Sequence, residues 1–440
     1  MIGIKLLYAQ FTNKGEKTEC ANYRGISLLS HVGKVYERII ESRLRYCVEE
    51  KLGEWQHGFR PNRSTTDLVF TLKIILEKSW EWNIEKYIAF IDLEKAFDRI
   101  NRQSLWRSLQ HEEYEITPKL IRVIKSIYDD TKSRVKNREV ESERFKIETG
   151  VRQGGVLSPL LFILYMDRCL KEICKVEEKE ITLAYADDVA VVTGTLEDLQ
   201  EAMTRWNDTM NTMGMKINTQ KTEIMKVARI KEECNVYIEN LKLNQTDKFS
   251  YLGVLFDEEN RQILEISNRI QKYNANVNIL YPILKDKNVP VKAKIIIFTT
   301  ILRPILIYGS ETWTLTTRTS SQIQAAEMRV LRIILGVTRL DRMRNEVIRE
   351  RLNVTSILKI INKNKLRWFG HVKRMDNSRY AKTFLEWVPG GRRPVGRPRK
   401  RWMEGVREAA EEWGKPLEEI IRNQDYLDRN LWRRFLEAGQ

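Results

Sequence analysis

Cysteine, histidine, glycine and proline are all scarce in this 440-residue sequence. It contains 5 cysteines, 4 histidines, 21 glycines and 10 prolines. The cysteines are scattered and show no C-x-x-C spacing, so neither a disulfide framework nor a zinc knuckle is expected. The low glycine and proline content excludes a collagen-like or low-complexity chain. The composition is that of a folded globular protein.

Long uninterrupted hydrophobic runs are also missing. The longest apolar stretch, residues 295–308, is broken by Arg303 and Pro304, whereas a membrane-spanning helix needs about 20 apolar residues. The first residues, MIGIKLLYAQFTNK, have too short an apolar run for a secretory signal and lack its small-residue cleavage site. We therefore expect an intracellular protein without a membrane partner.

Positive charge, by contrast, is abundant. There are 76 Lys and Arg residues against 60 Asp and Glu, a formal net charge of +16. Such an excess favours a polyanionic partner, because binding releases the partner's condensed counterions. Nucleic acid is the first candidate, and a basic protein without such a partner is the alternative. The length predicts two or three domains.

Helical periodicity is clear in two parts of the chain. From Asn22 to about Glu50, after a turn at 23–25, the spacing of apolar residues predicts an amphipathic helix. Its expected apolar face holds Leu28, Val32, Val35, Ile39 and Leu44. Beyond Phe256, four further helical patterns predict a mostly helical second part, at residues 263–284, 291–302, 322–334 and 345–353.

Two acidic clusters follow β-prone runs. Residues 87–91 predict a short strand that ends at Asp92, and ITLAYADDVAVV predicts a hairpin whose turn carries Asp187 and Asp188. Converging carboxylates are the hard ligands that hold two Mg²⁺ ions for nucleotidyl transfer. We expect Asp92 and Asp187 to be the principal ligands, with Asp188 assisting. The alternative is that Asp92 caps a helix and the pair lies in an exposed turn.

The order of several sequence blocks resembles the palm motifs of reverse transcriptases, particularly those of non-LTR retrotransposons. The blocks are FIDLEKAFDRI (90–100), TGVRQGGVLSPLLFILYMD (149–167), AYADDVAVV (184–192), GMKINTQKTEIM (214–225) and YLGVLF (251–256). Upstream, residues 22–44 and 56–69 resemble the family's finger motifs. The likeness spans about residues 17–256 and implies an α+β, right-hand polymerase with fingers, a palm built on an antiparallel sheet, and a helical thumb.

The resemblance also assigns roles to individual residues. It implies that Phe97 excludes a 2′-hydroxyl and so selects deoxynucleotides, although Phe97 could instead be a core aromatic. It implies that Gln153 and Gly154 contact the nucleotide and the template; the alternative for these two residues is a surface turn. It also implies that Lys221 lies near the pyrophosphate; the alternative is a solvated surface lysine. The finger arginines expected to bind triphosphate or template phosphate are Arg24, Arg60 and Arg63. Two Mg²⁺ ions, or Mn²⁺ in their place, are the implied cofactors.

The most basic stretch lies between Lys363 and Trp402. Residues 366–375 and 391–402 resemble the carboxy-terminal region of some animal elements of this kind. The segment GRRPVGRPRKRW is too rich in Gly, Pro and Arg for regular structure and is expected to lie extended. Its candidate nucleic-acid ligands are Arg392, Arg393, Arg397 and Arg399. A nuclear-localisation signal and a solvated linker are the alternatives.

Together these observations predict an RNA-directed DNA polymerase that extends a DNA primer on an RNA template with dNTPs. Fingers and palm are expected at 1–256, the thumb at 257–345 and a basic region at 346–440. The expected setting is an element ribonucleoprotein in the cytoplasm and nucleus. Because no endonuclease motifs precede the polymerase blocks, we expect a fragment or a degenerate copy. The alternatives are a catalytically silent remnant that binds RNA or DNA, and an RNA-dependent RNA polymerase.

Overall fold

The computed structural model describes residues 6–12, 23–129, 132–137, 140–174, 179–391, 393–396 and 398–438. By its internal contacts the chain forms two compact units. Unit 1 comprises Met1–Thr65, Lys86–Lys226 and Glu232–Thr246, and unit 2 comprises Thr66–Glu85, Val227–Lys231 and Asp247–Gln440. Each unit is described by itself. The predicted divisions after residues 256 and 345 concern function and remain predictions.

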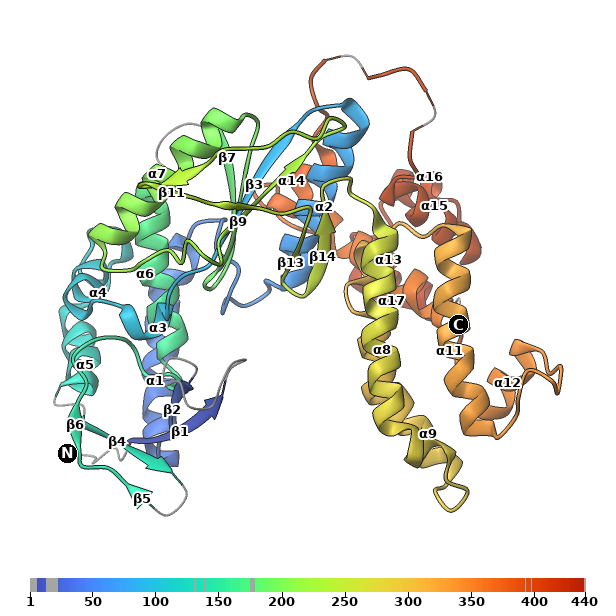
Figure 1. Cartoon of the computed structure of the whole chain (residues 1–440), viewed down its shortest axis with the longest axis horizontal. Helices are drawn as coiled ribbons and strands as arrows, with labels where there is room; N and C mark the ends of the chain where they lie inside the picture. Colours follow the sequence, from blue (N-terminus) through green and yellow to red (C-terminus); the bar gives the residue numbers. More distant parts are fainter. Residues whose placement is uncertain are drawn as a thin grey trace. The chain divides into compact units, whose positions relative to one another are not determined.

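The central sheet of unit 1 has the strand order β12-β9-β3-β8-β7 (Figure 1). Its strands are β3 (Lys86–Ile91), β7 (Glu180–Tyr185), β8 (Asp188–Thr193), β9 (Glu223–Val227) and β12 (Asn244–Gln245). The pairs β3–β8 and β8–β7 are antiparallel, and β12–β9 is parallel. Both the predicted strand before Asp92 and the predicted hairpin are therefore confirmed.

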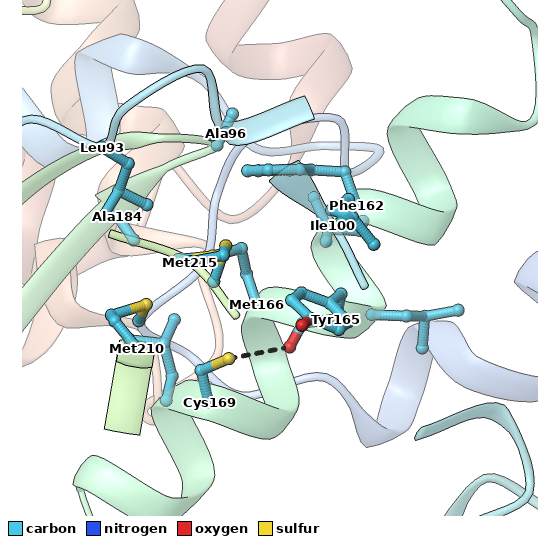
Figure 2. Packing of buried hydrophobic residues seen from close by; sticks show 14 of the residues in the cluster. Leu93, Ala96, Ile100, Phe162, Tyr165, Met166, Cys169, Ala184, Met210 and Met215 are labelled. Atoms are coloured by element: carbon cyan, nitrogen blue, oxygen red, sulfur yellow. Dashed lines mark hydrogen bonds between the residues drawn. The ribbon is translucent and has the colours of Figure 1, made fainter. Parts of the chain in front are cut away.

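Helix α7 (Leu196–Thr212) packs on strands β3 and β8 of this sheet. Helices α4 (Arg102–Leu109), α5 (Pro118–Tyr128) and α6 (Ser158–Ile173) contribute side chains to the same apolar core. Almost every side chain of α6 is buried because the helix runs through the middle of the core. Figure 2 shows part of this core, in which Leu93, Ile100, Phe162 and Ala184 are labelled.

Helix α1 (His31–Val48) is amphipathic, as predicted, but much of its predicted apolar face is exposed. Val32 and Val35 are 64% and 62% exposed. Leu44 is buried as predicted, and the interior also receives Ile40 and the carboxylate of Glu37, which the predicted face did not include. The predicted turn at 23–25 is also wrong, since these residues belong to strand β2 (Tyr23–Ser27) and the helix begins later.

The reason for the rotation of α1 is the set of partners of Glu37. Its Oε2 accepts hydrogen bonds from Val156 N at 2.7 Å and Leu157 N at 3.2 Å. Its Oε1 lies 3.6 Å from the guanidinium of Arg152. A buried carboxylate is tolerated when it is paired and hydrogen-bonded, so these partners outweigh the pattern of valines.

A second sheet of unit 1 joins the first strands to a later segment. Its order is β2-β1-β4-β5, and β6 pairs with β4. The strands are β1 (Leu6–Thr12), β2, β4 (Lys132–Asn137), β5 (Val140–Glu141) and β6 (Phe145–Lys146). A short hairpin, β10 (Tyr237–Ile238) with β11 (Leu241–Lys242), completes the strands of this unit.

Unit 2 is mainly helical, as the patterns beyond residue 256 predicted. It contains the hairpin β13 (Lys248–Tyr251) and β14 (Val254–Asp257) and the following helices: α2 (Thr65–Trp82), α8 (Gln262–Lys285), α9 (Val291–Ile297), α10 (Arg303–Ile307), α11 (Thr317–Leu335), α12 (Asn345–Leu352), α13 (Ile357–Lys373), α14 (Tyr380–Glu386), α15 (Trp402–Glu412), α16 (Leu417–Asn423) and α17 (Arg429–Ala438). Among the described residues, no helix is both long enough and apolar enough to cross a membrane.

Two apolar cores stabilise unit 2. One lies among α8, α10, α11, α12 and the start of α13. In the other, Phe70 and Ile74 of α2 pack with residues of the last helices. Phe70 makes edge contacts with Trp368 and Trp402, at centroid distances of 5.6 and 4.7 Å. Helix α2, part of the predicted finger block, therefore shares its core with the carboxy-terminal region.

Candidate active site

The three acids lie at one end of two neighbouring strands. Asp92 directly follows β3, and the tight turn between β7 and β8 carries Asp187 and leads into Asp188. In the antiparallel register Ile91 faces Val189, and Tyr185 faces Asp188 across the turn. Continuing the β3–β8 register by one residue brings Asp92 opposite Asp188, on the same face of the sheet. We call β7, β8 and their turn the acid hairpin.

The three acids at this strand edge are all at least partly exposed. The side chain of Asp92 is 43% exposed, Asp187 is half-buried and Asp188 is exposed. The backbone of Asp92 is held in place, because its N–H donates to Thr222 Oγ1 at 3.2 Å and its carbonyl accepts from Asn218 N at 2.8 Å. A metal-dependent site needs ligands whose backbone is fixed and whose carboxylates are exposed to the incoming ion.

Lys221 lies at the same edge. Its Nζ is 4.0 Å from Oδ2 of Asp92, and its side chain is 71% exposed. It arrives there because residues 216–218 pair with the segment after β3, as in the bridge between Leu93 and Ile217. The block around 214–225 therefore adds a cation beside the first acid.

The carboxylates of these acids are suitable ligands for Mg²⁺, but among the described residues they are not gathered into a complete set of metal ligands. Among the described residues there is no group of three or more His, Cys, Asp or Glu side chains arranged to hold a metal ion. Mg²⁺, however, is commonly bound through one or two carboxylates, with water and substrate phosphates as its other ligands. Acids on adjacent strand ends, accessible from outside, suit that mode of binding.

Phe97 lies on the short helix α3 (Ala96–Arg99), five positions after Asp92. Its ring stacks on Phe162 of α6, with centroids 4.4 Å apart and planes 5° apart. Phe59 contacts it edge-on at 6.3 Å. Two aromatic neighbours thus fix the orientation of a ring that remains half-buried.

The loop with Gln153 and Gly154 is joined to several elements of unit 1. Gln153 O accepts from Ser27 N of β2 at 2.6 Å, and Val151 N donates to Phe97 O at 2.9 Å. Gly154 has φ 96°, a backbone conformation that favours glycine. Gly154 is exposed and Gln153 is half-buried, so both remain accessible.

Arg152 belongs to the same loop, and its side chain is buried beneath it, at only 7% exposed. Its guanidinium lies over the ring of Tyr128 at 5.1 Å and donates to Ile127 O, besides its pairing with Glu37. Neither Arg152 nor Glu37 was predicted as a site residue. Glu37 is not on the predicted apolar face of its helix, and the local pattern gave no sign of the distant groups that either residue contacts.

The finger arginines with described side chains bind protein groups. Arg60 Nε donates to Glu49 Oε1 at 2.8 Å, and its Nη atoms donate to Glu49 O at 2.9 Å and Gly53 O at 2.6 Å. Arg63 Nη1 donates to Glu54 Oε2 at 2.6 Å. The backbone of Arg24 lies in β2, and its side chain is outside the described residues.

In unit 2 the basic segment lies on α2. Arg399 stacks over the ring of Trp80 at 4.3 Å and donates to Glu259 O at 2.5 Å. Arg393 Nε lies 3.1 Å from Glu81 Oε1, and Arg401 Nε donates to Glu81 Oε2 at 2.8 Å. Arg392 and Arg397 are outside the described residues.

Comparison with known proteins identifies the family of this chain. The profile of the family described as reverse transcriptase (RNA-dependent DNA polymerase) matches residues 13–256, more than half of the chain. The chain belongs to this reverse transcriptase family. The resemblance to reverse transcriptases and the prediction of an α+β right-hand polymerase fold are thereby confirmed, and the relatives described next bear out the resemblance to non-LTR retrotransposon polymerases.

Curated relatives come from mobile elements. A probable RNA-directed DNA polymerase from transposon X-element of Drosophila melanogaster is 26% identical over 82% of this chain and 40% of that protein. The RNA-directed DNA polymerase from mobile element jockey, from the same species, is 26% identical over 72% of this chain and 36% of that protein. The chain therefore spans about 40% or less of the length of these relatives.

Solved structures of telomerase are similar to this chain at low identity. The telomerase of Candida tropicalis in complex with a fragment of telomeric RNA matches 88% of this chain and 64% of that chain, with 14% identity and a TM-score of 0.44. The telomerase of Candida albicans in the corresponding complex covers 87% of this chain and 64% of that chain, with 11% identity and a TM-score of 0.39.

Proposed function

We propose that this chain is an RNA-directed DNA polymerase whose active site is the strand edge with Asp92, Asp187 and Asp188. The single observation that supports this most directly is the β3–β8 register, which brings Asp92 opposite Asp188, the residue next to Asp187. The substrates are an RNA template, a DNA primer and dNTPs. An element ribonucleoprotein in the cytoplasm and nucleus is the proposed setting.

The cofactor in this proposal is a pair of Mg²⁺ ions, with Mn²⁺ as a substitute. When bound, the two ions would stabilise the attacking 3′-hydroxyl oxygen and the leaving pyrophosphate oxygen of an in-line displacement. Asp92 and Asp187 are the principal ligands and Asp188 assists. Lys221, at 4.0 Å from Asp92, is placed to balance their charge and to donate a proton to the departing pyrophosphate.

Specificity is assigned to residues around this edge. Phe97 is held rigid by Phe162 and Phe59, so its ring can exclude a 2′-hydroxyl by contact. Gln153 and Gly154 contact the incoming nucleotide and the template from the accessible side of their loop. Arg24 is the remaining finger candidate for a phosphate contact.

The buried and paired arginines receive a different role. Arg60 and Arg63 hold the finger loop through their bonds to Glu49, Gly53 and Glu54. Arg393 and Arg399 hold the basic segment on α2 through Glu81 and Trp80. Since a guanidinium has five donors in a fixed fork, these bonds leave fewer of them for phosphate.

Primer extension on poly(rA)/oligo(dT) with dTTP and Mg²⁺ tests the proposal. The wild-type chain should add dTMP, and Asp92→Asn or Asp187→Asn should lower the rate by roughly 10³-fold, because a lost metal ligand costs several kcal/mol of transition-state stabilisation. Asp208→Asn, an exposed acid on α7, is the matched control and should retain the wild-type rate. A wild-type protein that binds the duplex and adds no dTMP contradicts the proposal and favours a silent binding protein.

A further inference from the structure

The finger loop at residues 53–60 continues the sheet beyond the acid hairpin. Ala184 N donates to Trp55 O at 2.8 Å, and His57 N donates to Ala184 O at 2.8 Å. These two bonds form a parallel bridge between Gln56 and Ala184. The loop therefore covers the edge of β7 just before the turn that carries the acids.

The side chain of Gln56 reaches one residue further, to the turn itself. It is fully buried, at 0% exposed. Its Oε1 accepts from Ala186 N at 2.9 Å, and its Nε2 donates to Ala186 O at 3.3 Å. Oε1 also accepts from Gly58 N at 2.8 Å. A carboxamide suits this place because it carries a donor and an acceptor on neighbouring atoms.

Ala186 needs such support because its backbone is unusual. Its φ is 59°, in the left-handed region that residues other than glycine rarely adopt. A conformation of this kind persists when surrounding groups hold it, and it is common at functional sites. Because Ala186 directly precedes Asp187, the two bonds from Gln56 fix the peptide from which the first hairpin acid extends.

Close packing at Gly58 reinforces the same contact. A Cβ at this position would overlap Ala186 N and come within 3.0 Å of Ala186 Cα. A glycine here allows the loop backbone to lie directly against the turn. The backbones of the loop and the turn are therefore in contact, with no room for a side chain at position 58.

The other end of the loop is anchored to the core of unit 1. Asp167 of α6 is 0% exposed and its Oδ1 accepts from Gly53 N at 2.9 Å and from Trp55 Nε1 at 3.2 Å. Its Oδ2 accepts from Tyr114 OH at 2.8 Å. A path of hydrogen bonds therefore runs from α6 through the loop to the turn before Asp187.

We infer that Gln56 is a positioning residue for the polymerase reaction. It holds the Ala186 peptide in its left-handed conformation and so sets the direction of the Asp187 carboxylate toward Asp92. The inference rests on the proposed function, since it concerns the alignment of the same acids. It adds to that function a finger residue that touches neither substrate nor metal.

Gln56→Met tests this role because methionine is similar in length and lacks both hydrogen-bonding groups. We expect kcat for dTMP addition to fall about 10- to 100-fold, since small misplacements of a catalytic group have effects of this size. The Mg²⁺ concentration at half-maximal rate should rise several-fold, while the Kd for the RNA–DNA duplex stays at the wild-type value. Gly58→Ala should shift kcat and the Mg²⁺ requirement in the same direction.

Gln200→Met is the matched control within unit 1. Gln200 makes the same pair of bonds, to Tyr237 O at 2.9 Å and from Tyr237 N at 2.8 Å, on strand β10. Its removal should leave kcat and the Mg²⁺ requirement unchanged. If Gln200→Met alters both as strongly as Gln56→Met, the effect is general loosening and the inference is wrong.

Gln56→Glu allows a second test, in which the rate of dTMP addition is measured as a function of pH. A purely structural role of Gln56 predicts no pH dependence of the rate relative to wild type. The protonated carboxyl reproduces both bonds of the carboxamide, whereas the carboxylate cannot donate to Ala186 O. The ratio of the variant rate to the wild-type rate should therefore rise as the pH is lowered from about 9 to about 6. This variant keeps both acceptor contacts and remains informative if Gln56→Met fails to fold.

The outcomes separate the two proposals. If the wild-type chain adds no dTMP, the proposed function fails. If the wild type is active and Gln56→Met and Gln56→Glu both match it in kcat and Mg²⁺ requirement, the positioning role is overturned while the function stands. A ratio for Gln56→Glu that is low and independent of pH also contradicts the positioning role.

Discussion

The rings of Phe97 and Phe162 stack face to face, with centroids 4.4 Å apart and planes only 5° apart. Phe162 belongs to the fully buried part of α6, so Phe97 is packed against a helix in the core of unit 1. The residue that the family resemblance assigns to sugar discrimination is therefore supported by the core. Its position relative to Asp92 is set by packing as well as by the five-residue spacing.

Phe97→Ala should relax discrimination against ribonucleotides. Removing the ring opens space for a 2′-hydroxyl, and we expect the ratio of kcat/KM for dTTP over UTP to fall by about 10-fold or more. Single-nucleotide incorporation with each substrate measures this ratio. Phe97→Tyr keeps the ring and should retain discrimination. If the wild-type chain already accepts UTP as readily as dTTP, the assignment fails and an RNA-dependent RNA polymerase is favoured.

Asp167→Ala should destabilise unit 1. The carboxylate is fully buried and accepts bonds from Gly53, Trp55 and Tyr114, and Lys171 Nζ lies 2.9 Å away. Its removal leaves buried donors without an acceptor, at a cost of about 3 kcal/mol in the free energy of unfolding. Urea unfolding followed by tryptophan fluorescence measures this. The control Asp208→Ala should change it by less than about 0.5 kcal/mol, and equal effects of the two variants would contradict the anchoring role of Asp167.

The stability of unit 2 should pass through a minimum near neutral pH, and Glu77 and Lys73 are two of the buried groups that contribute to it. Burial raises the pKa of Glu77 to about 7 and lowers the pKa of Lys73 to about 8. Between the unfolded value of about 4.5 and pH 7, the folded protein holds the Glu77 proton more tightly, so its stability falls as pH rises. Between pH 8 and about 10.5 the unfolded chain holds the Lys73 proton more tightly, so stability rises with pH.

Two substitutions isolate these contributions. Glu77→Gln keeps an acceptor for Trp402 N, which donates to Glu77 at 2.8 Å, and should make the fall below pH 7 less steep. Lys73→Met should make the rise above pH 8 less steep, while Lys78 and Lys365, whose pKa values burial also lowers to about 8, still contribute to it. Each substituted group contributes a slope of at most about 1.4 kcal/mol per pH unit. Chemical denaturation across the pH range measures the slopes, and parallel curves for wild type and variant would exclude the group concerned.

Arg399→Ala should lower the thermal stability of unit 2 and leave the salt dependence of RNA binding unchanged. The guanidinium stacks on Trp80 and bonds to Glu259 O, so its loss removes protein contacts. Glu81→Gln should have a similar effect, with a cost of about 1 to 2 kcal/mol, because Glu81 binds both Arg393 and Arg401. A fall of about 0.9 in the slope of log K against log salt for Arg399→Ala would instead show a phosphate contact.

The placement of the three acids is the part of the candidate site that the sequence predicted best. A β-prone run ending at Asp92 and an apolar hairpin interrupted by Asp187 and Asp188 have few physical explanations other than a shared strand edge. Local pattern sufficed because strand alternation and tight turns depend on neighbouring residues. The predicted strand and hairpin match β3 and the β7–β8 pair of the structure.

The contacts that hold this edge could not be read from local pattern. Gln56 lies 130 positions from Ala186, and Gly53 lies 114 positions from Asp167. Nothing in the periodicity around these residues indicates which distant backbone group each one bonds. The same holds for Glu37, whose inward position reversed the expected face of α1.

The sequence by itself determined the family, the α+β class, the strand and hairpin that carry the acids, and the helical character beyond residue 256, because these depend on residue type and spacing along the chain. Tertiary structure alone decided which charged groups enter the interior, that α2 shares a core with the carboxy-terminal helices, and that the finger loop holds the peptide before Asp187. Those features depend on pairing between groups far apart in the chain, where burial makes each unpaired donor or charge costly and so selects one arrangement.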